Sequence, residues 1–193
     1  MGDICSVITK GTTPKKYSDC GVSFIKTEAF DGTNIMIDKL SYIDEETHLK
    51  ELKRSILQEN DILLTIAGAT IGKCAMVTAN ILPANTNQAL AIIRLKDGNL
   101  KRYVMSVLQS NHMKNYIQKS IKGSAQPNLN LQQLNDFVFP LPTIEEQERI
   151  VSILDKFDSL SNDLQKGLPA EIEARQKQYE YYREKLLTFK KLS

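Results

Sequence analysis

Side chains suited to binding phosphate groups and the polar edges of planar bases gather in four short segments of the sequence. Lysines neutralise phosphates, glycine lets a backbone approach closely, and Asn and Gln amides form paired hydrogen bonds with the edge of adenine. The residues concerned are Lys10, Gly11, Thr12, Thr13, Lys15 and Lys16; Thr70 and Lys73; Asn85, Thr86, Asn87 and Gln88; and Lys122, Ser124 and Gln126. They are candidate contacts to nucleic acid, although the same residue types are common in turns that bind no ligand.

The sequence holds no residue pattern typical of catalysis. Residues 68–73 resemble a P-loop, but the segment is one residue short and Cys74 stands where Ser or Thr would bind magnesium. His48 and His112 lack a spaced set of further ligands, and the acidic residues 44–46 are typical of a helix start. We therefore predict a binding protein that is not an enzyme and that holds no cofactor or metal.

Composition limits the class of protein further. With 41% hydrophobic and 25% charged residues, the chain is typical of a globular protein. Its net charge of +2, with a slight excess of Lys and Arg before residue 143, permits nucleic-acid binding without requiring it. Cys5, Cys20 and Cys74 form no CxxC pair, which predicts reduced thiols in a cytoplasmic protein. No signal-peptide pattern and no run of about 18 apolar residues is present, so no membrane association is expected.

The four segments fall between elements of mixed type. Short apolar runs bounded by turn residues predict strands, and apolar positions spaced by three and four predict helices. Strands are expected at residues 22–26, 62–66, 73–77 and 89–95, and helices at residues 44–57 and 100–121. Gly68 and Gly72 predict a hairpin or tight loop between two of the strands. Residues 1–142 are thus expected to form a mixed α+β domain with a small twisted β-sheet and helices.

A helical arm is predicted over residues 143–193. Thr143 and Glu146 form a capping-box pattern, and Pro142 keeps the preceding chain extended. A first, short helix should follow, because apolar residues then recur at alternating spacings of three and four. Gly167 and Pro169 predict a Gly-Leu-Pro break before a longer, coiled-coil helix.

The second helix is expected at residues 170–189. Residues spaced by three or four positions along it form a heptad seam on one face. The seam residues are Ile172, Arg175, Tyr179, Tyr182, Leu186 and Phe189. An isolated amphipathic helix of this length is marginal in water, so the seam needs a partner. That partner is either another part of the same chain or a second chain, and a second copy would give a two-fold symmetric dimer with these residues buried in its interface.

One run in the arm carries a family resemblance. Residues 141–158, LPTIEEQERIVSILDKFD, resemble the opening of the conserved helical region in specificity subunits of Type I restriction-modification enzymes. The upstream order is similar to that of a target recognition domain in the same family, with Gly11-x-Thr13-Pro14 near the start, Gly68 and Gly72 in the middle, and Asn87-Gln88 after them. The resemblance extends over almost the whole chain.

The resemblance implies a non-catalytic subunit that reads DNA sequence for other subunits. Residues 1–142 would be the target recognition domain, which binds double-stranded DNA, and residues 143–193 would be the conserved helical region. Modification (methyltransferase) subunits, and through them the restriction subunit, would be its partners. Members of the family usually hold two such domains and two helical regions, whereas this chain holds one of each.

A half-length subunit would restore the full architecture as a homodimer paired through antiparallel helices. Twenty helical residues extend about 30 Å, at about 1.5 Å per residue, and one turn of DNA is about 34–36 Å long. The arm would then hold two recognition domains over the halves of a bipartite target. From the residues alone, a second function stays open, in which the chain is a coiled-coil assembly module whose globular domain binds protein instead of DNA.

Overall fold

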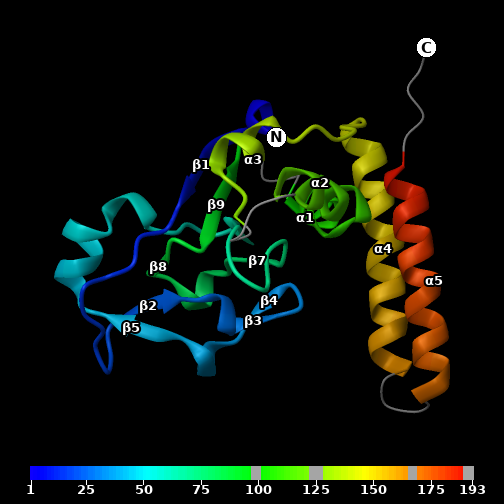
Figure 1. The fold of residues 1–193 in the computed structure, drawn as a ribbon. Coiled ribbons are helices and arrows are strands. Elements are labelled where there is room, and N and C mark those ends of the chain that lie inside the picture. Colours follow the sequence, from blue (N-terminus) through cyan, green and yellow to red (C-terminus); the bar gives the residue numbers. More distant parts are fainter. Residues whose placement is uncertain (97–100, 122–127, 165–168, 189–193) are drawn as a thin grey trace.

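We analysed a computed structural model, which describes residues 1–96, 101–121, 128–164 and 169–188. Of residues 161–164 and 169–172 it describes the backbone only. A globular part with short strands is followed by a hairpin of two long helices that stands beside it (Figure 1). The expected α+β fold with a C-terminal helical arm is confirmed.

The elements are short in the globular part and long in the arm. The strands are β1 Cys5–Lys10, β2 Val22–Ile25, β3 Phe30–Asp31, β4 Asn34–Ile35, β5 Ser41–Ile43, β6 Ile62–Thr65, β7 Cys74–Met76, β8 Ala84–Thr86 and β9 Leu90–Leu95. The α-helices are α1 Lys101–Gln109, α2 Asn111–Ile121, α3 Leu131–Asp136, α4 Ile144–Leu164 and α5 Pro169–Leu187. Single turns are η1 Gly2–Ile4, η2 Thr27–Ala29, η3 Ile37–Lys39, η4 Thr47–Glu51, η5 Lys53–Ser55 and η6 Ala79–Ile81.

Two larger sheets and the two-stranded sheet β3-β4 form the globular part. The four-stranded sheet has the order β1-β9-β6-β7 with antiparallel neighbours, and the three-stranded sheet has the order β5-β2-β8. Side chains alternate across β6, so that Ile62 and Leu64 face one hydrophobic cluster and Leu63 faces another. Helices α1, α2 and α3 cover the first face, and β2 and β8 help to cover the second. The sheet is therefore buried on both sides.

The apolar runs predicted four of the strands, including the edge strand β7, and missed the others. β2, β6, β7 and β9 lie within the four expected segments. β1 was not predicted, because its side chains are mostly half-exposed and its sequence lacks a continuous apolar run. β8 was not predicted either, because its buried polar residues look like those of a turn.

The segment expected as one helix at residues 100–121 is two helices. Ser110 separates α1 from α2, and its hydroxyl donates to the carbonyl of Val107 at 2.7 Å and accepts from the amide of Met113 at 3.4 Å. A serine that bonds to nearby backbone in this way competes with the helical pattern. The amide of Asn111 then donates to the carboxylate of Glu184 in α5 at 2.7 Å, which ties the start of α2 to the arm.

Helix α4 begins where the capping pattern predicted, but only half of the box forms. The amide of Glu146 donates to the Thr143 hydroxyl at 3.4 Å. The Glu146 carboxylate does not return to the Thr143 amide; it accepts from the Arg149 guanidinium at 2.7 and 2.6 Å instead. A charged partner one turn along gives the stronger, paired hydrogen bonds, so the carboxylate takes that alternative.

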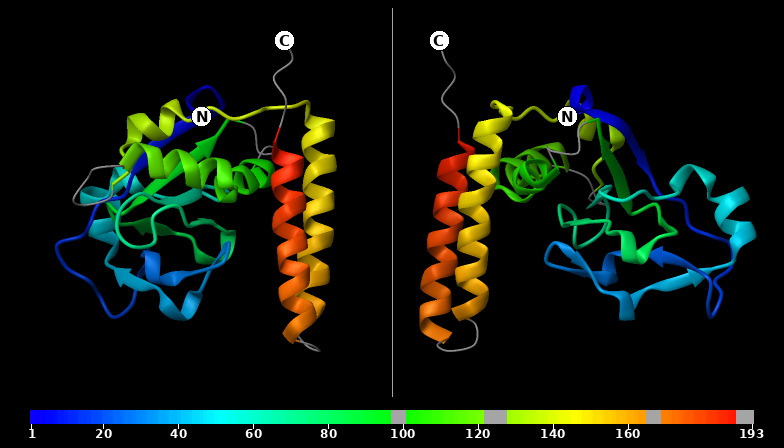
Figure 2. Two further views of the ribbon diagram at one scale, coloured as in Figure 1. Left: turned by 45° about the vertical axis from the view of Figure 1, so that its right-hand side comes forward. Right: turned by 180° about the vertical axis from the view of Figure 1, so that it is seen from behind.

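Pro169 is the first residue of α5, as its fixed φ favours. The prediction of a short first helix is wrong, because α4 has 21 residues and α5 has 19. The two helices run antiparallel and pack on each other for most of their length (Figure 2). The arm is therefore a helical hairpin within the chain.

The hairpin packs directly against the globular part. Ile150 and Leu154 of α4 are 1% and 2% exposed and belong to the same cluster as the four-stranded sheet. Arg102 of α1 forms an ion pair with Asp155 of α4. The hydroxyl of Tyr103 donates to the carbonyl of Pro140 at 2.8 Å. A continuous apolar core, with polar contacts at its margin, holds the arm at a fixed angle to the sheets.

The predicted seam of the second helix faces more than one environment. Tyr179 and Leu186 are half-buried against the core of their own chain. Tyr182 is 36% exposed and stacks on Phe157 of α4, with ring centroids 5.3 Å apart. Arg175 is exposed. The side chain of Ile172 and the whole of Phe189 lie outside the described residues.

Candidate nucleic-acid interface

Sheet topology brings three of the four predicted segments to one end of the four-stranded sheet. Lys10 at the end of β1 pairs with Ala91 near the start of β9, and Thr65 at the end of β6 pairs with Leu90. Because neighbouring strands are antiparallel, β1 and β6 end where β9 and β7 begin. The loops after Lys10, after Thr65 and before Leu90 therefore meet, and we call them the loop cluster.

Gly11 holds the first of these loops against the third. Its amide donates to the carbonyl of Leu90 at 3.1 Å, and the amide of Thr12 donates to the carbonyl of Thr86 at 3.0 Å. A Cβ atom at Gly11 would lie 2.2 Å from the backbone oxygens of Thr86 and Asn87. The glycine is buried and is required by contact with the protein's own backbone, which differs from the predicted approach to a ligand.

The second loop is a tight β-hairpin connection. Gly68 and Gly72 have φ values of 88° and 92°, which glycine adopts without strain. The amide of Gly72 donates to the carbonyl of Thr65 at 2.9 Å and closes the loop. A strand, β7, follows it, whereas a P-loop leads into a helix whose amide groups bind phosphate. Thr70 is half-exposed and Lys73 is exposed at this end of the sheet.

Backbone bonds connect the second loop to its neighbours. The amide of Ile66 donates to the carbonyl of Ala89 at 2.8 Å, which joins the second and third loops. Ala67 forms an isolated bridge with Asn128, the last residue of the fourth predicted segment. Lys122, Ser124 and Gln126 of that segment lie outside the described residues.

The prediction that Asn85 and Thr86 lie in a ligand-facing loop is wrong. Both belong to β8 and are fully buried. The Asn85 amide donates to the carbonyl of Leu52 at 3.0 Å, and its oxygen lies 2.5 Å from the Nδ1 atom of His48. The Thr86 hydroxyl donates to the carbonyl of Ile25 at 2.9 Å. Buried polar groups need internal partners, so these side chains secure β8 and cannot reach a ligand.

Asn87 and Gln88 are more exposed than Asn85 and Thr86. Asn87 is half-buried, and its side-chain oxygen accepts from the amide of Ala89 at 3.1 Å. This bond leaves the amide nitrogen of Asn87 available as a donor. Gln88 is exposed, as are Lys10 and Thr13, while Thr12 is half-exposed. The loop cluster therefore presents amide, hydroxyl and ammonium groups together.

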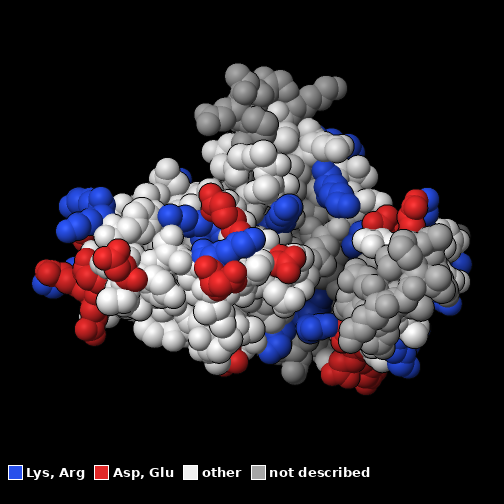
Figure 3. All heavy atoms as spheres, turned by 90° about the horizontal axis from the view of Figure 1, so that it is seen from below, with Lys and Arg blue, Asp and Glu red and all other residues white. Residues whose placement is uncertain are grey.

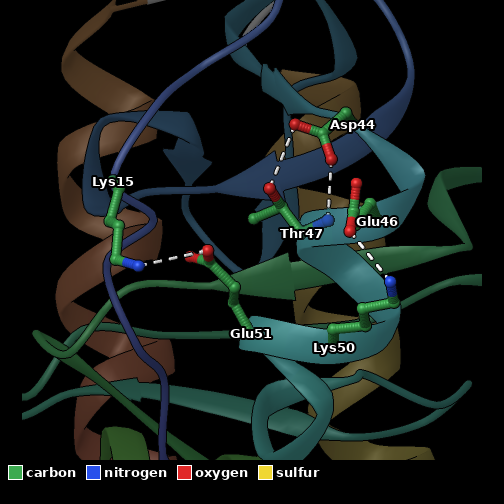
Figure 4. Close-up of polar contacts among 6 residues, drawn as sticks. All are labelled: Lys15, Asp44, Glu46, Thr47, Lys50 and Glu51. Atoms are coloured by element: carbon green, nitrogen blue, oxygen red, sulfur yellow. Dashed lines mark hydrogen bonds and ion pairs between the residues drawn. The ribbon is translucent and has the colours of Figure 1, made fainter.

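Lys15 and Lys16 are exposed, and Lys15 is paired with an acidic side chain that lies outside the loop cluster. The Lys15 ammonium lies 3.3 Å from the carboxylate of Glu51 in η4 (Figure 4). The same view shows Asp44 accepting from the amide and hydroxyl of Thr47, at 2.7 and 3.0 Å. These bonds lower the pKa of the Asp44 carboxyl, so this acidic segment is a helix start, as expected.

Charge is mixed over the surface. Seen from below, Lys and Arg side chains alternate with Asp and Glu among the described residues, in keeping with the small net charge (Figure 3).

Among the described residues, no group of His, Cys, Asp and Glu is arranged to hold a metal ion. Within the same ranges, no helix has the length and apolar character needed to cross a membrane. Burial raises the pKa of the Cys74 thiol to about 12, which makes it unreactive at neutral pH.

Comparison with known proteins identifies the family. The family model for the Type I restriction modification DNA specificity domain matches residues 1–174. The chain is 33% identical over 160 residues to a specificity subunit of Escherichia coli, EcoR124I/EcoR124II, and the match covers 83% of this chain and 39% of that subunit.

Solved structures agree with the fold. A chain from work on assembly of the type I R-M system superposes with a TM-score of 0.66 at 18% identity, covering 96% of this chain and 44% of that chain. The HsdS subunit from Thermoanaerobacter tengcongensis superposes with a TM-score of 0.59 at 17% identity, over 86% and 42% of the two chains. This chain thus spans about two-fifths of the length of these relatives, and it belongs to the family of Type I restriction-modification DNA specificity domains.

Proposed function

We propose that this chain is a non-catalytic specificity subunit that reads one half of a bipartite DNA target. The loop cluster would contact the DNA through Lys10, Thr12, Thr13, Lys73 and Gln88, with Lys16, Thr70 and the nitrogen of Asn87 beside them. Lysines and hydroxyls suit phosphate contacts, and Asn and Gln amides suit the edge of adenine in the major groove. Lys122, Ser124 and Gln126 remain part of the proposal on sequence grounds.

A single observation carries this proposal. The family match spans both the globular part and most of the arm. Three of the four polar segments chosen from the sequence also meet at one end of the four-stranded sheet, as loops of an antiparallel sheet do, and side chains exposed there can bind one ligand together.

The partners follow from the same proposal. The arm would bring modification subunits, and through them a restriction subunit, to the bound site. Two copies would pair through their arms, so that two identical recognition domains lie on one target. Exposed apolar side chains on the hairpin, together called the strip, support this pairing: Leu160, Tyr181 and Tyr182 are 51%, 60% and 36% exposed.

Methylation mapping tests the proposal directly. The chain would be combined with a modification subunit of a Type I system, and random genomic DNA would be exposed to the complex with a methyl donor. We expect adenine methylation at one sequence motif made of two equal halves with a fixed spacer. Methylation without sequence choice, or none, would contradict the proposed function, and two unequal halves would contradict the symmetric pairing alone.

A further inference from the structure

A basic hollow lies on the face of the four-stranded sheet, next to the loop cluster. Its volume is about 250 Å³. The residues that line it include Thr9 of β1, Ile92 and Arg94 of β9, and Lys53, Arg54 and Gln58 from the segment around η5. None of the described residues that line it is acidic. The hollow is therefore suited to an anionic ligand.

The positive charge of the hollow comes mainly from two residues that the sequence did not single out. The Arg94 guanidinium donates to both carboxylate oxygens of the buried Asp61, at 2.8 and 2.7 Å, so its charge is balanced within the protein. Lys53 and Arg54 are exposed, and no acidic side chain lies with them in the wall of the hollow. Two uncompensated cations beside a hydroxyl and an amide match the needs of a phosphate group.

The backbone that carries these cations is fixed. The Ser55 hydroxyl donates to the carbonyl of Leu52 at 3.1 Å and lies 3.3 Å from the Asn85 amide nitrogen. Asn85 itself belongs to β8, so η5 is joined to the second sheet. A cation held on an anchored turn loses less conformational entropy on binding than one on a free loop.

The position of the hollow beside the loop cluster indicates which anion it binds. Thr9 in the wall of the hollow directly precedes Lys10 of the loop cluster, so the two features are continuous along β1. We propose that the hollow binds the sugar-phosphate backbone of the same DNA that the loop cluster reads, through Lys53 and Arg54, without contact to bases. This inference rests on the proposed function. It divides the interface into a part that selects sequence and a part that supplies sequence-independent affinity.

The test compares three forms of the full chain. They are the wild type, the double variant Lys53→Ala with Arg54→Ala, and the charge-preserving variant Lys53→Arg with Arg54→Lys. Each is titrated with the duplex found by methylation mapping and with a random-sequence duplex of equal length, at several salt concentrations. Lys39→Ala, which removes an exposed cation of η3, is the control for removal of charge elsewhere.

The alanine variant should bind both duplexes more weakly by the same factor, roughly tenfold or more. The slope of log K against log salt should fall by about 1.8, at about 0.9 for each phosphate that the variant no longer neutralises. The charge-preserving variant and Lys39→Ala should keep the wild-type slope. An unchanged slope in the alanine variant, or a changed ratio between the two duplexes, would overturn the inference while leaving the proposed function intact. Failure of the wild type to bind either duplex would overturn both.

Discussion

At the scale of single residues, similar side chains a few positions apart have opposite roles. Asn85 and Gln88 are both amides in a polar stretch that looks uniform in the sequence. Asn85 is fully buried and bonds to η4 and η5, while Gln88 is exposed at the loop cluster. Asn85 lies within β8, where all three residues are buried, whereas Gln88 lies beyond the end of the strand, and this difference separates the structural amide from the candidate contact.

Replacing Asn85 with Ala should destabilise the protein by about 2–4 kcal/mol. The change removes a buried side chain, leaves the Nδ1 atom of the buried His48 without its partner, and takes one of its donors from the Leu52 carbonyl. Urea denaturation measures the loss, with Gln88→Ala as the matched amide variant. Gln88→Ala should alter the free energy of unfolding by less than about 0.5 kcal/mol and weaken binding to target DNA. Equal destabilisation by both variants would contradict this division of roles.

At the scale of elements, docking of the hairpin depends on one face of α4. Leu154 points into the core that α4 shares with the sheet, and it is 2% exposed. Leu160 lies nearly two turns further along the same helix and is 51% exposed. Leu154 thus contributes to the packed core, whereas Leu160 leaves an apolar side chain exposed on the surface.

Leu154→Ala should lower the free energy of unfolding by about 2–4 kcal/mol, because it opens a cavity in a packed core. Leu160→Ala should change the same quantity by less than about 0.5 kcal/mol, since it removes surface that is already largely in water. Denaturant titration followed by far-UV circular dichroism measures both. A small effect of Leu154→Ala would mean that α4 does not depend on this docking.

A carboxylate within the hairpin gives a pH-dependent contribution to stability. Desolvation raises the pKa of Asp158, and the neighbouring Asp155 adds to the rise, while a hydrogen bond from Tyr179 opposes it. A raised pKa means that the folded state prefers the protonated carboxyl. The contribution of Asp158 to stability is therefore greatest below its unfolded pKa and is lost as the pH rises through its folded pKa.

Asp158→Asn should accordingly raise the melting temperature at pH 7, by no more than a few degrees because the site is partly solvated. The gain should shrink as the pH is lowered, because the wild-type carboxyl, whose pKa is raised, then becomes protonated. Melting curves at intervals between pH 4 and pH 8 measure the effect. A gain that is constant with pH would contradict the assignment.

At the scale of the whole molecule, one side of the arm packs against its own chain, and we propose that another side binds a second copy. Residues such as Tyr179 and Leu186 are already half-buried against their own chain, so they contribute to the intramolecular core. The exposed strip of Leu160, Tyr181 and Tyr182 is the surface left for a second copy. The proposed dimer would therefore form between hairpins, not between isolated helices.

Sedimentation at micromolar concentration tests this pairing. The wild type should sediment as a dimer, and the variant Leu160→Glu with Tyr181→Glu should sediment as a monomer, because charges would enter an apolar contact. Gln176→Glu places a charge on another side of α5 and should leave the dimer intact. A monomeric wild type, or a dimer that tolerates both charges, would count against pairing through this strip.

The order of amino acids was sufficient to predict the strongly patterned parts of this protein. Apolar runs located β2, β6, β7 and β9, and heptad spacing with a capping threonine located the arm. These features depend on local periodicity and on residues close in the chain, which the sequence expresses directly. The family resemblance has the same origin, because the motif that carries it is one continuous run.

Which polar residues are free to bind depended instead on the tertiary structure. Burial of Asn85, the position of Gly11 against the backbone of residues 86–87, and the pairing of Lys15 with Glu51 all join segments distant in the sequence. Lys53 and Arg54 are candidate phosphate contacts because the tertiary structure places η5 beside β1 and β9. Exposure and proximity follow from long-range packing, which a pattern of neighbouring residues does not contain.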